Sequence, residues 1–250
     1  MSKKNQSLLY VLFLALLSVL LFFGCSPKVE FDFSTITSKQ NLTVGADISF
    51  STGISETAVS AIKNLTGISP DEPLFDKKAI SESLKSSGLK EKAVLLNSDS
   101  SIDVKIYSAD LSKIGNTDTP IFKTLYNKTT KEVSVSTVLN QEAFENLFSI
   151  FPEEFADYAE LLMAPIFTGE KLSQEEYLEL IGAAYGNSLQ KELADSVCIL
   201  KGSTPGKITN LIWNNKEITD FIGKNNFQIS IPLSFLLAAN DEISFSVSWK

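Results

Sequence analysis

Apolar and polar residues alternate along much of this chain of 250 residues, and strict alternation predicts strands with one buried face. The alternation is clearest near the end, where serines separate Ile243, Phe245, Val247 and Trp249. Similar patterns predict strands at residues 29–33, 42–51, 92–97, 102–108, 120–127, 131–139, 196–202, 204–213 and 227–233. Many of these runs are adjacent pairs, which favours hairpins over repeated strand–helix–strand units.

Other stretches repeat apolar residues every three or four positions, as amphipathic helices do. Helices are predicted at residues 55–65 and 76–87, in a helical region at 140–163 where Pro152 would begin a new helix, and at 173–186 and 188–194. A short apolar helix or turn is predicted at 234–240. The helix at 173–186 has the clearest start, because Ser173 and Glu176 have the spacing of a capping box, in which each satisfies a backbone N–H of the other.

The helical stretch 140–163 carries the densest apolar face of the chain. That face includes Phe144, Phe148, Phe151, Phe155 and Leu161. Packing against a sheet is the simpler interpretation of such a stripe. The alternative is that these five residues form the wall of an apolar ligand pocket.

Together these elements predict an α+β fold, with antiparallel sheets built from hairpins and several helices packed on a face. Residues 29–250 are expected to form a single domain of this kind, or two closely packed lobes at about 29–120 and 121–250.

The first residues follow a different pattern. Lys3 and Lys4 precede an uncharged apolar run at 8–23. This run is shorter than the roughly 20 residues of a membrane-spanning helix, and a charged start followed by a short apolar core is typical of a secretory signal. An uncleaved membrane anchor is the alternative interpretation.

The run ends in Gly24-Cys25, and this ending resembles the lipobox of bacterial lipoproteins, in the relaxed form found in spirochaetes. Phe22 is a departure, because that position is usually leucine. The resemblance implies that the Cys25 thiol receives a lipid and that cleavage between Gly24 and Cys25 removes residues 1–24. Residues 25–28 would then be the lipidated cysteine and a short tether.

The C-terminal third carries a second resemblance. A PGKI sequence at 205–208, a turn near Asn214-Asn215, an IPL sequence at 231–233 and a closing strand to Trp249 are similar to the LppM-type lipoprotein domain. The similarity extends over residues 42–249. It implies an antiparallel sheet packed by helices on an extracytoplasmic lipoprotein, and it carries over no active site.

Composition excludes several kinds of chemistry. The chain has no histidine, so Ser-His-Asp and Cys-His catalysis and His-containing zinc sites cannot be built from its own residues. It also has no arginine and a net charge of −8, which disfavours nucleic acid as a partner. Cys198 lies in an apolar strand-like run and is expected to be a buried, inert thiol. We expect no cofactor and no metal.

The sequence therefore predicts a lipoprotein anchored to the cell membrane or outer membrane, on the extracytoplasmic side. Its partners would be the bilayer, through acylated Cys25, and an unidentified envelope protein or apolar ligand. The expected function is a non-catalytic binding or structural module of the envelope. Two alternatives are a carrier or chaperone for an apolar ligand or lipid, and a hydrolase that uses carboxylates or a Ser-Lys pair.

Overall fold

The computed structural model describes most of the chain after residue 27. The described residues are 28–37, 42–53, 90–98, 101–114, 121–140, 169–239 and 241–250, with Pro165 and isolated positions between 55 and 81.

The first sheet has six strands in the order β10-β7-β1-β2-β4-β3. Their bounds are β1 Lys28–Thr37, β2 Leu42–Gly53, β3 Lys90–Ser98, β4 Ser101–Ser108, β7 Val197–Ser203 and β10 Asn226–Pro232. Neighbouring strands are antiparallel except β1 and β7, which run parallel with Lys28 opposite Ile199. This sheet therefore combines the first strands of the chain with two strands from its last quarter.

The second sheet has five antiparallel strands in the order β5-β6-β11-β8-β9. Their bounds are β5 Phe122–Asn127, β6 Glu132–Leu139, β8 Ile208–Trp213, β9 Lys216–Glu217 and β11 Ile243–Trp249. The alternation along β11 is visible in its burial, because its four apolar residues are buried and the serines between them are partly exposed. One face of this sheet therefore belongs to the core.

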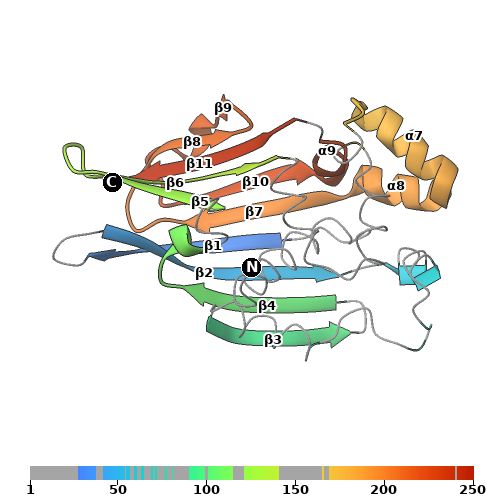
Figure 1. Cartoon of the computed structure of the whole chain (residues 1–250), viewed down its shortest axis with the longest axis horizontal. Coiled ribbons are helices and arrows are strands. Elements are labelled where there is room, and N and C mark those ends of the chain that lie inside the picture. The colour runs from blue at the N-terminus through green and yellow to red at the C-terminus, as the bar shows by residue number, and fades with distance from the viewer. Residues whose placement is uncertain are drawn as a thin grey trace, which may run out of the picture.

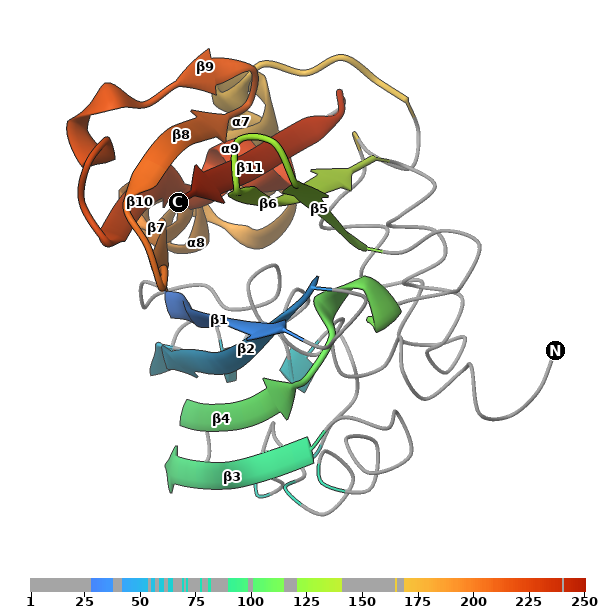
Figure 2. The same cartoon turned by 90° about the vertical axis from the view of Figure 1, so that its left-hand side faces the viewer.

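The two sheets pack face to face as a sandwich, and aromatic side chains join them. The ring of Phe33 in β1 stacks on Trp249 in β11 with centroids 5.6 Å apart. Phe227 in β10 meets Phe245 in β11 at 5.7 Å. Figure 2 shows the second sheet above β1 to β4. Aromatic pairs at these distances add to the free energy gained from burying their area.

Three α-helices have bounds in the described residues, and they lie together at one end of the strands (Figure 1). These are α7 (Gln174–Tyr185), α8 (Asn187–Asp195) and the short α9 (Leu233–Leu237). The described residues also form two 3-10 helices, η1 (Leu111–Lys113) and η2 (Thr219–Phe221). α9 follows β10 directly and contacts both α7 and α8. None of the helices within these ranges is long and apolar enough to cross a bilayer.

The predicted α+β class, with several helices packed on a sheet face, is wrong. The described residues are dominated by strands, and the inner faces of the two sheets cover each other. The helices α7, α8 and α9 instead gather at one end (Figure 1). The cause is that strands on both sides of the core alternate in polarity, so each sheet supplies the apolar surface that the other needs. The parallel β1–β7 pair also departs from the expected antiparallel sheets.

Many individual elements match their predictions. The capping box is present, with the Glu176 N–H donating to Ser173 Oγ at 3.2 Å and the Ser173 N–H donating to Glu176 Oε2 at 2.8 Å. The described positions of the predicted helix 55–65 that follow Ser55, such as Glu56 and Lys63, are helical. The predicted helical stretch 140–163 lies outside the described residues, apart from Asn140.

Candidate functional site

A groove of about 570 Å³ opens at the end of the sandwich where the three helices lie. It lies between the end of β8 with the β9–η2 segment on one side and the end of β10 with α9 on the other. β9 and β10 are the edge strands of their sheets. The groove therefore lies between an edge strand of each sheet, at one corner of the sandwich.

The β8–β9 hairpin forms the first wall, and its turn is fixed by two asparagines. Asn214 and Asn215 adopt positive φ angles of 46° and 62°, a conformation that asparagine tolerates better than most residues. The Asn214 N–H donates to the carbonyl of Ser244 at 2.7 Å, so the turn is tied to β11. The hairpin holds Trp213 and Lys216 on the groove.

The segment that follows β9 is held against β8 by backbone hydrogen bonds. The Ile218 N–H donates to Leu211 O at 2.8 Å, and the Gly223 N–H donates to Ile208 O at 2.8 Å. Gly223 has a φ of 80°, which suits glycine. These bonds fix η2, so Thr219 and Asp220 form a defined part of the rim.

The opposite wall combines β10, α9 and the start of α7. Pro232 ends β10, and the Leu233 N–H donates to Ser196 O at 2.9 Å, which ties the start of α9 to the segment before β7. The Ser234 hydroxyl donates to Gln174 Oε1 at 3.4 Å, so α9 and α7 meet there. This wall brings Gln174 and Phe235 to the groove.

The groove surface combines an aromatic part with a polar rim. Trp213 and Phe235 are half-buried and supply apolar surface, while Lys216, Glu217 and Asp220 are exposed on the rim. One lysine stands with two carboxylates, so the rim carries a net charge of −1. Such a surface suits a ligand that has an apolar face and hydrogen-bonding groups and carries little charge of its own.

The groove lies near the start of β1. Lys28 stands opposite Ile199 in β7, and Ile199 stands opposite Ser230 in β10, which borders the groove. Neighbouring strands are about 4.8 Å apart, so Lys28 and Ser230 are separated by about 10 Å. A tether attached before Lys28 would therefore join the sandwich at the end that carries the groove.

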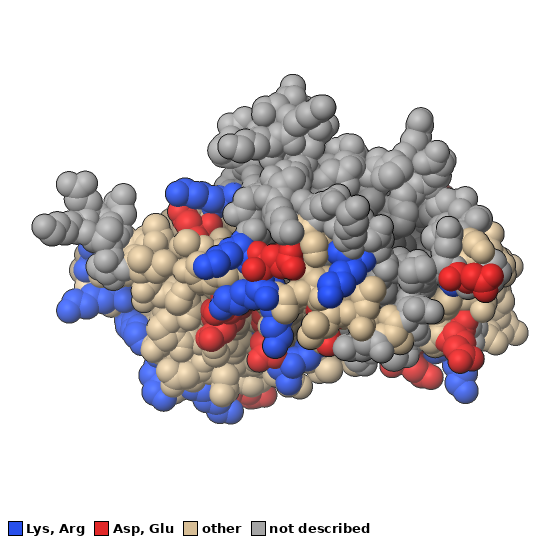
Figure 3. Space-filling model, turned by 90° about the horizontal axis from the view of Figure 1, so that it is seen from below, with Lys and Arg blue, Asp and Glu red and all other residues tan. Residues whose placement is uncertain are grey.

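The outer face of the first sheet is polar. Glu30 lies in a row with Lys201 and Lys105, and its carboxylate forms an ion pair with Lys28 at 2.7 Å. The hydrogen bond from Lys28 lowers the pKa of Glu30, and the nearby lysines act in the same direction. Figure 3 looks from below toward the β3 edge of this sheet, the lowest strand in Figure 1, and shows lysines and acidic residues interleaved on that side. The described surface in that view is a solvated face of mixed charge.

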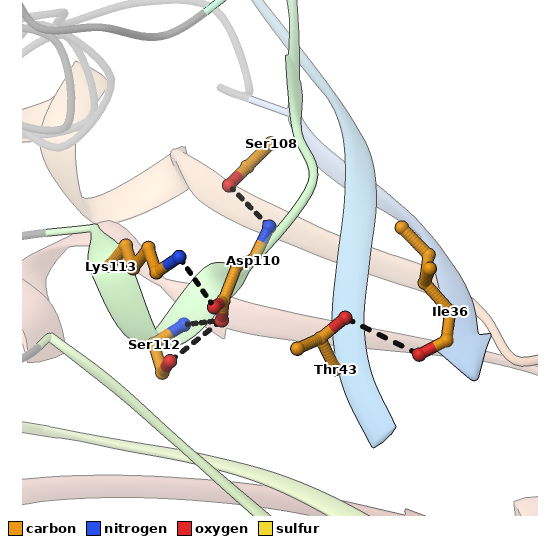
Figure 4. A network of polar contacts seen from close by, with 6 residues as sticks. All are labelled: Ile36, Thr43, Ser108, Asp110, Ser112 and Lys113. Atoms are coloured by element: carbon orange, nitrogen blue, oxygen red, sulfur yellow. Dashed lines mark hydrogen bonds and ion pairs between the residues drawn. The ribbon is translucent and has the colours of Figure 1, made fainter. Parts of the chain in front are cut away.

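The polar cluster after β4 is explained by capping. The Asp110 carboxylate accepts hydrogen bonds from the Ser112 N–H at 3.1 Å and the Ser112 hydroxyl at 2.6 Å, which starts η1 (Figure 4). Lys113 Nζ lies 3.5 Å from the same carboxylate. The turn places Leu111 and Ile114 in the core. These contacts serve the local fold.

Cys198 is a buried thiol, as predicted. It is 4% exposed in β7, and burial raises its pKa to about 12. A thiol with so high a pKa holds almost no thiolate at neutral pH, and the thiolate is the reactive form. Cys198 is therefore inert.

The site residues predicted from sequence lie outside the described residues. These are the cleavage and lipidation positions Gly24 and Cys25 and the apolar set Phe144, Phe148, Phe151, Phe155 and Leu161. The structure therefore does not bring these residues together with the groove or place them elsewhere.

Sequence reasoning did not identify the groove. Its residues come from three separate segments: the start of α7, the β8–η2 stretch, and the end of β10 with α9. Each segment was predicted as a turn, strand or helix without a functional role. The one local signal is the Asn214-Asn215 turn, which marks the hairpin that carries Trp213.

No group of three or more histidine, cysteine, aspartate and glutamate side chains in the described ranges could hold a metal ion. Comparisons with protein-family models, with curated proteins and with solved structures give no match. The argument for function therefore depends on the residues themselves.

Proposed function

We propose that this chain is a membrane-anchored extracytoplasmic lipoprotein whose folded body is a non-catalytic binding or structural module of the cell envelope. The observation that carries the proposal is the N-terminal sequence: two lysines, an uncharged run at 8–23 and Gly24-Cys25. Two acyl chains on one cysteine are enough for stable attachment, because each buried methylene contributes about 0.8 kcal/mol.

The position of β1 supports this arrangement. The first strand begins at Lys28, only three residues after Cys25. Three residues span at most about 10 Å, so a lipid on Cys25 would hold the sandwich against the bilayer surface. The end that faces the bilayer would be the one that carries the groove.

The chemistry of the chain supports a binding role over a catalytic one. It lacks histidine, which is the commonest general base. Its buried thiol, Cys198, is inert. The acidic pair Glu175 and Glu176 lies in the first turn of α7, where Glu176 completes the capping box and the helix dipole favours negative charge.

The test is metabolic labelling with radioactive palmitate in a bacterium that processes lipoproteins. The native chain and a Cys198→Ala control should take up label, and Cys25→Ala should take up none. Intact mass should show that residues 1–24 are lost from the native chain. A native chain that stays unlabelled, or that keeps its leader, contradicts the proposal.

A further inference from the structure

We propose that the groove beside Trp213 is a binding site for an uncharged saccharide. This deepens the proposed function, since it names the class of ligand that the binding module would take. The inference uses four observations: the aromatic surface of the groove, the polar rim, the charge balance and the free edge of β10.

The aromatic surface suits one face of a sugar ring. Trp213 is opposite Phe245 in the sheet, so its side chain lies on the inner face of β8, yet it stays half-buried because the groove is open there. The face of an aromatic ring carries the negative part of its quadrupole. The C–H groups on one face of a pyranose are slightly positive and apolar, so they pack well on such a ring.

The rim suits the hydroxyl groups of the same ligand. Asn214, Thr219, Asp220 and Gln174 line the groove and supply both hydrogen-bond donors and acceptors. Lys216 stands with two carboxylates, Glu217 and Asp220, so an anionic ligand would meet an excess of negative charge. An uncharged polar ligand avoids this repulsion and can use both the donors and the acceptors.

An acyl chain fits this surface less well. The groove is open to solvent, and exposed polar and charged residues share its surface with the apolar ones. A hydrocarbon chain placed there would stay partly in water and would desolvate the polar side chains without giving them hydrogen bonds, which is costly.

An extended peptide is disfavoured by the edge of β10. The Thr204 N–H donates to Asn225 O at 2.8 Å and the Leu233 N–H to Ser196 O at 2.9 Å, so the odd-numbered residues of β10 bond to β7. The even-numbered ones then present their backbone groups to the free edge. Pro232 is one of them and has no N–H, and proline on an edge opposes the addition of a strand.

Tryptophan fluorescence gives a direct test, because the chain has two tryptophans and Trp249 is only 2% exposed. Acrylamide quenching of the full chain in detergent therefore reports mainly on Trp213. The probes are chitotetraose, maltotetraose and cellotetraose, with dodecanoate and an alternating Val-Thr hexapeptide as the apolar and peptide alternatives. We expect at least one saccharide to protect Trp213 in a saturable way at millimolar concentration or below.

Two variants and one control make the result specific. By calorimetry, Trp213→Ala should weaken saccharide binding at least about tenfold. Asp220→Ala, on the exposed rim, keeps the aromatic surface and should weaken binding by a similar factor through lost hydrogen bonds. Tyr126→Ala removes an aromatic residue that is 39% exposed on β5, the opposite edge strand of the same sheet, and should change nothing.

The inference is overturned if no saccharide protects Trp213, if only dodecanoate or the peptide does, or if Tyr126→Ala weakens binding as much as the groove variants. Palmitate labelling is a separate readout. A chain that takes up label but leaves Trp213 unprotected by every saccharide defeats the saccharide site and leaves the lipoprotein proposal standing.

Discussion

The interior of the sandwich and the groove at its end are built from the same alternating strands, but they expose their aromatic residues differently. Trp249 and Trp213 both lie on the inner face of the second sheet, in neighbouring strands. Trp249 is stacked on Phe33 and is 2% exposed, whereas Trp213 lines the groove and is half-buried. In our proposal, an inward-facing aromatic residue that stays half-buried marks the place where a ligand binds.

The largest effect is expected from the interior. Trp249→Ala removes a fully packed indole from between the sheets and should lower the free energy of unfolding by about 3–5 kcal/mol. Urea denaturation followed by circular dichroism measures the loss. A loss below that of Trp213→Ala would contradict the assignment of Trp249 to the core.

A smaller effect is expected from crowding the same interior. A Cβ added at Gly202 in β7 would lie 2.3 Å from the ring of Phe227 on the neighbouring strand. Gly202→Ala must therefore displace that ring and should cost about 1–3 kcal/mol in urea denaturation. Lys201→Ala, one residue earlier on the outer face, should stay within about 0.5 kcal/mol of the native chain. Equal values for the two variants would mean that Phe227 does not pack over Gly202.

Replacing tryptophan by alanine should cost less stability in the groove than in the interior. Trp213→Ala removes a half-buried indole and should cost only about 1 kcal/mol of stability. The urea midpoints of Trp213→Ala and Trp249→Ala, measured side by side, check this difference. If Trp213→Ala is as damaging as Trp249→Ala, then Trp213 is a core residue and the comparison fails.

The smallest effect concerns the capping box beside the groove. Hydrogen bonds from the backbone and then the side chain of Ser173 lower the pKa of Glu176 below its ordinary value of 4.5. A carboxylate whose pKa is lowered by folding stabilises the fold above its unfolded pKa, and this contribution is lost as pH falls through the folded pKa.

Acidification below pH 4.5 should therefore lower the stability of the native chain. Glu176→Gln should lose less stability on acidification, because it has no carboxylate at position 176 to protonate. The measurement is the urea midpoint at pH 7 and in the acid range. Glu175→Gln removes a charge from the same helical turn but keeps the capping box. It should therefore lose as much stability on acidification as the native chain does through Glu176. An unchanged acid dependence in Glu176→Gln would refute the linkage.

Local patterns explain which parts of the fold could be predicted. The alternation along β11 depends only on the period of a strand, and the capping box depends only on two residues three apart. The β5–β6 and β3–β4 hairpins follow from adjacent alternating runs. Each of these features depends on residues close together in the sequence, so it could be predicted from the sequence.

The features that could not be predicted depend on contacts between segments that are far apart in the sequence. Val29 pairs with Leu200 in the parallel β1–β7 ladder, and nothing local to either residue specifies the other. The place of α7, α8 and α9 at one end also depends on the opposing sheet already covering the strands. The groove has the same origin, because alternation predicts that Trp213 faces inward but not that residues of α7, α9 and β10 form an open groove beside it.

The most direct test of the account compares the two tryptophans by acrylamide quenching of two variants of the full chain. Trp249→Phe leaves only Trp213, and Trp213→Phe leaves only Trp249. The account predicts strong quenching and red-shifted emission for the chain that keeps Trp213. It predicts weak quenching and blue-shifted emission for the chain that keeps Trp249. Equal quenching in the two chains would contradict the distinction between a closed interior and an open groove.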